Sequence, residues 1–330
     1  MIALDVMGGD RAPEATVAGA IRWARSTGSR PILVGDITII HRLLDRGGED
    51  QAAWTSVSAP VTVGMDAQPV KAIRSLPEAS IRRCAELVKS GQAQALVSMG
   101  NTGAALAAGV LVVGRANGVE RPGLAALLPG GPKPTLLLDV GANVEARPEH
   151  LRDFGLMGAI YQQQTFGIVE PRVGILSNGE EITKGIPLVR DAAGLLAESP
   201  LTFIGHVEPA ALYGNTADVI VCDGFTGNLV LKSLEATAEF AFDEVRKGVR
   251  RHPYTLPGLA LMYPAIRSVR QSTDYAQYGG VPLLGVSGVV IIGHGRSNAV
   301  AVANALTVAA NGIRTNLVNR IAEGLTTIRR

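Results

Sequence analysis

The sequence predicts an α/β fold, a three-layer α/β/α sandwich of the Rossmann-like kind around a mostly parallel sheet. Short apolar runs recur along the 330 residues, and most are continuous, as expected for strands that helices cover on both faces. Segments with helical spacing of apolar residues separate these runs, and such alternation is typical of parallel sheets. The apolar fraction is 47%, whereas aromatic residues supply only 4%. This balance favours buried strands and closely packed helices.

The predicted elements follow one another in a regular order. Continuous apolar runs predict strands at 2–6, 31–35, 94–98, 134–138, 172–176, 201–205, 218–222 and 288–293. Helical spacing predicts helices at 13–26, 78–90, 103–117, 149–165, 187–198, 228–248 and 297–322. No repeat, low-complexity tract or flexible linker divides the chain, so residues 1–330 are predicted to form one α/β unit.

Residues 251–280 interrupt this alternation. Pro253, Pro257 and Pro264 surround an apolar run at 256–266, and two glycines follow at 279–280. Proline at this density interrupts helices and excludes a central strand. We expect a helical hairpin that packs against a second subunit. An apolar surface that faces lipid or another partner is the alternative.

The composition argues against several classes of protein. The net charge is +2 and the basic residues are scattered, which argues against a nucleic-acid partner. No stretch reaches the roughly 18 uninterrupted apolar residues of a membrane span, and no targeting peptide is recognisable, so we expect a cytoplasmic protein. Cys84 and Cys222 are too few and too far apart for a metal cluster or a disulfide framework. We interpret both as small buried side chains, and we predict no metal site.

The loop at 177–185 carries the strongest chemical signal. An apolar run ends in Ser-Asn-Gly, two glutamates follow, and Lys184 stands between Thr183 and Gly185. A predicted helix starts directly afterwards, with Pro187 near its first turn, where a missing N–H costs nothing. Exposed backbone amides together with one cation form a site for a tetrahedral anion such as phosphate.

Five further loops have a similar composition, and each follows a predicted strand. They are residues 5–10, 98–103, 139–143, 223–228 and 293–298. In open α/β sheets ligands bind beyond the carboxyl ends of the strands, so we expect all six loops to gather at one cleft. None of them contains a dinucleotide fingerprint or a Walker A motif.

Each loop also has a structural explanation, because glycine allows positive φ and Asn, Asp, Ser and Thr cap helices. Lys184 is alternatively a solvated cation beside a helix. His294, between two glycines, is either a proton donor or a packed loop residue, and His206 is interpreted as structural. No nucleophile elbow is present and neither cysteine has an obvious base, so covalent catalysis is not expected.

Seven motifs together resemble one known family. They are Met-Gly-Gly-Asp at 7–10, Gly-Asn-Thr-Gly-Ala at 100–104, Asp-Val-Gly-Ala-Asn at 139–143, Ser-Asn-Gly-Glu-Glu at 177–181 with Lys184-Gly185, Cys-Asp-Gly-Phe-Thr-Gly-Asn at 222–228, Tyr-Gly-Gly-Val-Pro-Leu-Leu-Gly-Val at 278–286 and Gly-His-Gly-Arg-Ser-Asn at 293–298. In this order, and over essentially the whole chain, they resemble the bacterial acyl-(acyl-carrier-protein):phosphate acyltransferases of phospholipid synthesis, the PlsX family. Arg11, His206 and Arg296 depart from the family pattern, so no role is carried over to them.

The resemblance implies a fold related to the isocitrate and isopropylmalate dehydrogenases and to the phosphotransacetylases. It implies transfer of a long-chain acyl group from acyl carrier protein to inorganic phosphate, which gives acyl phosphate for the acylation of glycerol 3-phosphate, with no cofactor. It also implies a homodimer, and some relatives associate peripherally with the membrane.

The chemistry of the loops agrees with such a reaction. Phosphate is itself the nucleophile, so the protein must hold a dianion beside a thioester and stabilise an oxyanion with amides and a cation. We expect Lys184 as that cation, His294 as a donor to the carbonyl or the leaving thiolate, and Asn228 as a third catalytic residue. The expected substrate-binding residues are Gly9, Asp10, Gly100, Asn101, Thr102, Gly103, Asp139, Asn143, Asn178, Gly179, Glu181, Asp223, Gly227 and Asn298.

Two other functions fit parts of the sequence. A dehydrogenase of the isocitrate class would need NAD(P) and a divalent metal held by clustered aspartates, but Asp10, Asp139 and Asp223 stand in separate loops. A non-catalytic scaffold could bind acyl carrier protein and recruit synthesis enzymes to the membrane. Such a scaffold would need neither a phosphate site nor loss of the thioester.

Overall fold

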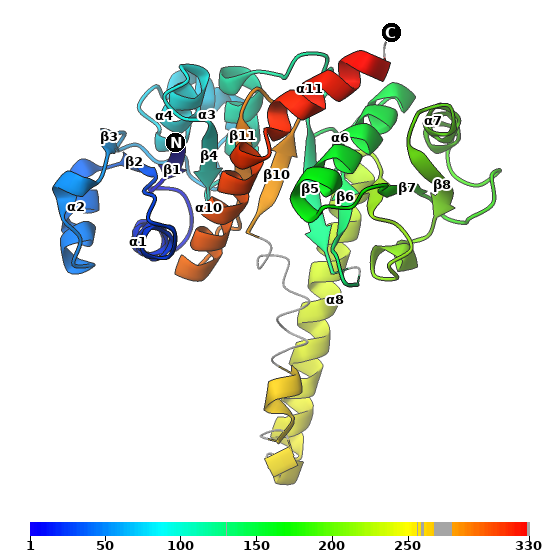
Figure 1. The fold of residues 1–330 in the computed structure, drawn as a ribbon. Coiled ribbons are helices and arrows are strands. Elements are labelled where there is room, and N and C mark those ends of the chain that lie inside the picture. The colour runs from blue at the N-terminus through cyan, green and yellow to red at the C-terminus, as the bar shows by residue number, and fades with distance from the viewer. Residues whose placement is uncertain (130, 256, 259–260, 267–278, 329–330) are drawn as a thin grey trace.

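The computed structural model describes residues 1–129, 131–255, 257–258, 261–266 and 279–328, and it contains one continuous sheet of eleven strands (Figure 1). The strands are β1 Ile2–Asp5, β2 Ile32–Gly35, β3 Ser56–Ser58, β4 Ala95–Ser98, β5 Gly123–Leu128, β6 Thr135–Leu138, β7 Arg172–Leu176, β8 Thr202–Val207, β9 Val219–Val221, β10 Val281–Leu284 and β11 Val289–Ile292. The helices are α1 Glu14–Thr27, α2 Ile37–Arg46, α3 Pro69–Ser75, α4 Ser80–Lys89, α5 Thr102–Ala108, α6 Pro148–Phe166, α7 Pro187–Ala197, α8 Gly224–Arg251, α10 Ala299–Arg314 and α11 Leu317–Ile328.

The predicted α/β sandwich is confirmed, and all eight predicted strands are present within two residues of their expected ends. The sequence did not reveal β3, β5 and β10, nor helices α2 and α3. The single helix predicted at 297–322 is wrong, because Asn316 adopts a positive φ of 53° and separates α10 from α11. The helix predicted at 103–117 ends earlier, with a π-helical turn at Gly109–Val113 before Gly114.

Alternating side chains of each strand enter two helical layers. On β6, Leu137 packs on one face of the sheet, whereas Leu136 and Leu138 pack on the other. The first face is covered by α3, α4, α5 and the start of α8, and the second by α1, α2, α6, α7, α10 and α11. Figure 1 shows these helices on either side of the strands. Continuous apolar strands are the expected consequence of burial on both faces.

The sheet consists of two parallel blocks that run in opposite directions. Its strand order is β3-β2-β1-β4-β11-β10-β5-β6-β9-β7-β8. Three successive pairs, β11–β10, β10–β5 and β5–β6, are antiparallel, whereas the other described pairs are parallel. Three reversals leave the block β6-β9-β7-β8 pointing opposite to the block β3-β2-β1-β4-β11. The carboxyl ends of the two blocks therefore lie at opposite edges of the sheet, where an edge means a row of strand ends and not an outermost strand.

Helix α8 begins on the sheet and then leaves the body of the molecule. Gly224, Gly227 and Leu231 are buried, and Val230 and Leu234 pack against the core. Beyond them the helix projects away from the sheet, and the described residues between 253 and 266 lie beside its far end (Figure 1). The rest of the excursion predicted at 251–280 falls largely on residues 267–278, outside the described part of the chain. In that part, no helix is long and apolar enough to cross a membrane.

Gly227 allows α8 to approach the end of β6. A Cβ at this position would lie 1.9 Å from the carbonyl oxygen of Asp139 and 2.8 Å from the sulfur of Cys222. We therefore expect Gly227→Ala to lower the free energy of unfolding by about 3 kcal/mol, because backbone must move to accept the methyl group. Urea unfolding followed by circular dichroism measures this change.

Gly248→Ala on the same helix is the control, since nothing lies within 4 Å of its Cβ position. We expect this control to be neutral or to stabilise the protein by about 0.5–1 kcal/mol, as alanine does in an exposed helix. Equal effects of the two substitutions would contradict the close packing of α8 on β6.

Candidate functional site

The first loop group comprises residues 5–10, 98–103 and 293–298, which follow the neighbouring strands β1, β4 and β11. The buried carboxylate of Asp5 accepts hydrogen bonds from Ser98 Oγ (2.7 Å) and Met7 N (3.2 Å). The amide of Asp10 donates to the carbonyl of Gly295 (2.8 Å). Burial raises the pKa of Asp5, while the hydrogen bonds from serine oppose this shift. Asp5 was not among the predicted site residues, although its place before Gly8-Gly9 is a usable signal.

The polar side chains of the first loop group serve largely as helix caps. Asn101 Oδ1 accepts from Ala104 N (3.0 Å) at the start of α5, and its Nδ2 donates to the carbonyls of Gly64 and Met65. Asn298 Oδ1 accepts from Val300 N and Ala301 N at the start of α10. The remaining predicted residues range from buried to exposed: Gly100 is buried, Gly9 and Gly103 are half-buried, and Asp10 and Thr102 are exposed.

His294 retains a donor that can face a ligand. Its Nδ1 accepts a hydrogen bond from the amide of Arg296 (3.1 Å), so the neutral ring carries its proton on Nε2. The side chain is half-buried at the carboxyl end of β11. His294 can therefore donate a hydrogen bond from Nε2, as its predicted role requires.

The second loop group comprises residues 139–143 and 223–228, which follow β6 and β9. Asp139 is fully buried, and its carboxylate accepts from the amides of Leu124, Gly141, Ala142 and Asn143 and from Asn143 Nδ2, at 2.7–3.1 Å. Burial raises the pKa of Asp139, and the hydrogen bonds from these donors offset only part of that rise. With both oxygens satisfied, Asp139 organises the loop backbone and does not itself face a ligand.

Two other members of this group form hydrogen bonds within the loops, and a third has an exposed side chain. Asp223 caps α8 by accepting from Thr226 N (2.9 Å) and Thr226 Oγ1 (2.6 Å). Asn143 donates to the carbonyl of Pro122 (2.7 Å) and is buried. Asn228 is exposed on the first turns of α8, and a Cβ built on Gly141 would lie 3.8 Å from its Cβ. Of the residues predicted here, Asn228 alone presents an exposed side-chain amide.

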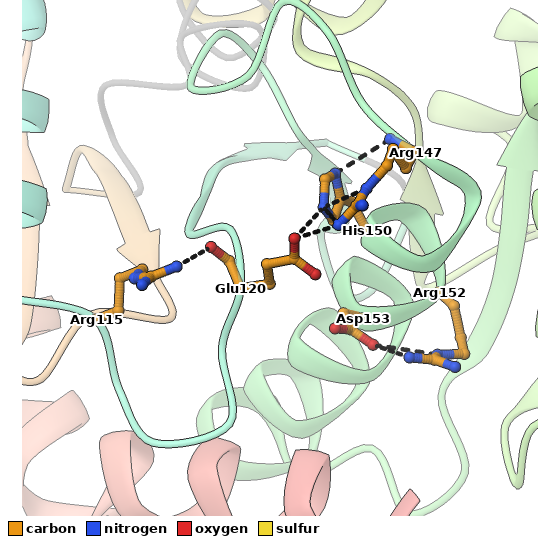
Figure 2. Close-up of polar contacts among 6 residues, drawn as sticks. All are labelled: Arg115, Glu120, Arg147, His150, Arg152 and Asp153. Carbon is orange, nitrogen blue, oxygen red and sulfur yellow. Dashed lines mark hydrogen bonds and ion pairs between the residues drawn. The ribbon is translucent and has the colours of Figure 1, made fainter. Parts of the chain in front are cut away.

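A brace of charged side chains joins Arg115, Glu120, Arg147 and His150 near the start of α6 (Figure 2). Glu120 forms an ion pair with Arg147, and His150 Nε2 lies 3.5 Å from the same carboxylate. The Nδ1 of buried His150 accepts from the amide of Arg147 (3.1 Å), and Arg115 Nη1 donates to the carbonyl of Glu120 (2.8 Å). This brace ties the segment before β5 to the start of α6. None of these residues was among the predicted site residues.

The lysine loop comprises residues 177–185, which follow β7. Gly185 has a positive φ of 87°, and its amide donates to Asn178 Oδ1 (3.0 Å). Gly179 is buried, whereas Asn178, Glu181 and Lys184 are exposed. Lys184 forms no ion pair with any carboxylate in the described part of the chain. Its ammonium is therefore available to an anion from solution.

The expectation that all six loops share one edge of the sheet is wrong. Because β10 and β5 invert the second block, the first loop group lies at one edge, and the second group with the lysine loop lies at the other. Helix α8 connects the two edges: Asn228 lies near Gly141, and Glu239 lies 3.8 Å from Arg296. The separation of eleven positions from 228 to 239 corresponds to roughly 16 Å along the helix. One phosphate ion cannot contact both groups in this arrangement.

The burial predicted for the two cysteines is confirmed, and His206 lies in the core as well. His206 is buried on β8, and its Nε2 has no hydrogen-bond partner in the described structure. Cys84 and Cys222 are buried, and burial raises the pKa of both thiols well above the usual range, which makes them poor nucleophiles.

Removing the Asp139 carboxylate should destabilise the whole second loop group. We expect Asp139→Ala to lower the free energy of unfolding by at least about 3 kcal/mol, because several buried donors lose their acceptor. Asp223→Ala is the matched control and should cost about 1 kcal/mol, the value of an N-cap. Chemical unfolding of both variants checks this order, and a smaller loss for Asp139→Ala than for Asp223→Ala would contradict it.

Known proteins resemble this chain along nearly its whole length. Residues 1–320 match the family described as "Fatty acid synthesis protein". The chain is 44% identical over 329 residues to a phosphate acyltransferase of Desulforudis audaxviator, covering 99% of this chain and 97% of that protein. It is 46% identical over 323 residues to a phosphate acyltransferase of Heliobacterium modesticaldum, covering 98% of this chain and 96% of that protein.

Solved structures with the same fold include two phosphotransacetylases and a dehydrogenase. The EutD phosphotransacetylase from Staphylococcus aureus has a TM-score of 0.61 at 17% identity, covering 94% of this chain and 93% of that one. A phosphotransacetylase from Streptococcus pyogenes has a TM-score of 0.62 at 15% identity, covering 99% and 94%. The 4-hydroxythreonine-4-phosphate dehydrogenase from Klebsiella pneumoniae has a TM-score of 0.53 at 12% identity, covering 98% and 99%. Their likeness supports the fold, and the sequence match shows that the chain belongs to the PlsX family of phosphate acyltransferases.

Proposed function

We propose that this phosphate acyltransferase takes a long-chain acyl group from acyl carrier protein and delivers it to inorganic phosphate. The acyl phosphate would then acylate glycerol 3-phosphate in phospholipid synthesis. The single observation that carries this proposal is the similarity along nearly the whole chain to phosphate acyltransferases, since the motifs of all six loops lie within the matched residues.

Phosphate binding is assigned to the lysine loop and the second loop group, which follow the neighbouring strands β7 and β9. Lys184 supplies the cation, and the adjoining loops supply backbone amides, with Asn228 as an exposed side-chain amide. Phosphate attacks the thioester carbon, the carbon–sulfur bond breaks, and the thiolate leaves. Holding the two reactants together and stabilising the oxyanion are the main contributions asked of the protein.

His294 is assigned to the carbonyl oxygen or the leaving thiolate, through the proton on Nε2. Within one chain, His294 belongs to the edge of the sheet opposite Lys184. We therefore propose that the complete site forms between two chains of a homodimer. Exposed apolar side chains near the lysine loop and along α8 support this arrangement; they are Ile182, Ile186, Leu229, Phe240 and Val245.

Peripheral contact with a membrane fits the far end of α8 in the same proposal. Tyr254, Leu261 and Tyr263 are between 61% and 85% exposed there. Arg250 and Arg251 lie in the last turn of α8 and would face anionic lipid, whereas Arg246 and Lys247 pair with Asp243 and Glu244.

The decisive assay mixes the purified protein with palmitoyl-carrier protein and phosphate and measures free carrier thiol. The proposed reaction predicts thiol release that depends on phosphate. A protein that binds the carrier but releases no thiol is the scaffold considered above, and that result would reject the enzyme assignment.

Lys184→Ala should abolish acyl-phosphate formation while the far-ultraviolet circular dichroism and the unfolding midpoint stay unchanged. The reason is that a cation at the developing oxyanion or phosphate contributes at least about 10²-fold to rate. Lys89→Ala, an exposed lysine at the end of α4, is the control and should keep wild-type turnover. Retention of more than about a tenth of the activity by Lys184→Ala would remove this lysine from the mechanism.

A mixing experiment tests whether two chains share the site. Lys184→Ala and His294→Ala are each expected to be inactive, and we expect activity to return when the two variants are denatured together and refolded as heterodimers. One of the two sites then contains an intact lysine and an intact histidine from different chains. If both residues act within one chain, every site of the heterodimer stays defective and no activity returns.

A further inference from the structure

A groove beside the first loop group is built on helix α3. Its volume is about 590 Å³, and it is lined by Gln68, Pro69, Val70, Lys71, Arg74 and Ser75. Val70 is 48% exposed, and Lys71 and Arg74 are exposed as well. The two cations are three residues apart on a helix, so their side chains are neighbours. The groove thus combines an apolar contact with a pair of positive charges.

Neither cation in the groove is neutralised by the described residues of the chain. In the described part of the structure, no carboxylate lies within ion-pair distance of Lys71 or Arg74. The neighbouring Arg82 is already engaged, because it pairs with Glu86 (3.0 Å) and donates to the carbonyl of Ile73 (2.9 Å) at the end of α3. The two positive charges on α3 are therefore available to a partner.

The groove is fixed to the first loop group by direct contacts. Asn101 Nδ2 donates to the carbonyls of Gly64 (3.1 Å) and Met65 (2.8 Å), just before α3. Pro69 packs so closely on Gly103 that a Cβ there would lie 2.6 Å from its ring. A molecule bound in the groove is consequently held next to the loop that contains Asn101 and Gly103.

We propose that this groove is the docking site for the acidic surface of the carrier protein that presents the acyl thioester. Lys71 and Arg74 would pair with carboxylates of the carrier, and Val70 would contact an apolar side chain between them. This inference rests on the proposed function, since it assumes a protein-borne acyl donor. Such a donor presents its thioester on a flexible arm, so its carrier must dock beside the site.

The shape and charge of the groove favour a protein over other anionic ligands. The groove is open to solvent and does not enclose a small ion, and Pro69 and Val70 add apolar surface beside the two cations. Paired charges at the rim of an interface mainly accelerate association and select the partner. A carrier with clustered carboxylates is the partner that this arrangement selects.

The test reverses the charge of the groove with the double substitution Lys71→Glu/Arg74→Glu. The matched control, Arg22→Glu/Arg42→Glu, changes the net charge equally on exposed positions of α1 and α2, which cover the opposite face of the sheet. Phosphate-dependent thiol release is measured with three donors: acyl-carrier protein, acyl-coenzyme A and a neutral acyl thioester of N-acetylcysteamine. Binding of the carrier is measured separately by fluorescence anisotropy at low and high salt.

We expect the groove variant to lose at least tenfold in kcat/KM with acyl-carrier protein, through KM, and to bind the carrier at least tenfold more weakly at low salt. Its activity with acyl-coenzyme A and with the neutral thioester should stay within twofold of wild type. The control should stay within twofold with every donor. Screening by salt should shrink the difference between wild type and the groove variant.

Three outcomes would overturn the docking site. One is unchanged carrier binding and turnover in the groove variant, and another is an equal loss in the control. The third is an equal loss with acyl-coenzyme A or the neutral thioester, which would place the two cations at the reacting groups or at a phosphate of the arm. If wild type releases no thiol from any donor, the proposed function fails, and the anisotropy measurement still decides whether the carrier uses the groove.

Discussion

The carboxylate of Asp139 accepts hydrogen bonds from the amide of Leu124 on β5 and from three amides of the loop after β6. The carbonyl of the same residue lies against Gly227, where α8 starts. One buried residue thus fixes the relative positions of two central strands and of the helix that crosses the sheet. A buried carboxylate is tolerated here because backbone donors replace its lost hydration.

The changes of strand direction between β11 and β6 limit which residues one substrate can contact. Two sets of loops with similar composition end at opposite edges, and α8 extends from one set towards the other. The exposed Lys184, the Nε2 proton of His294 and the exposed amide of Asn228 are consequently spread over a distance larger than one phosphate. In the proposed homodimer a second chain brings the complementary halves together, and the exposed apolar residues on α8 would form its contact surface.

Several residues that resemble ligand donors are engaged in holding the loops in shape. Asn101, Asp223 and Asn298 all cap helices, and Asn143 bonds to Asp139 and to Pro122. Substitution of these residues would disturb binding through the loop conformation, whereas substitution of Lys184 would act on charge alone. Asn101 has a second structural role, because its side-chain amide also connects the α3 groove to the first loop group.

The amino-acid sequence was enough to predict the fold class, most strand positions and the loops that carry chemistry, because continuous apolar runs and glycine-rich turns depend on local spacing. It also determined the family, through motifs that extend over the whole chain. The three-dimensional structure was needed to show which loops meet, since the direction of β10 and β5 in the sheet cannot be read from local composition. It likewise decided that Asp139 is buried under backbone donors while Lys184 is exposed, because burial depends on contacts between residues distant in the chain.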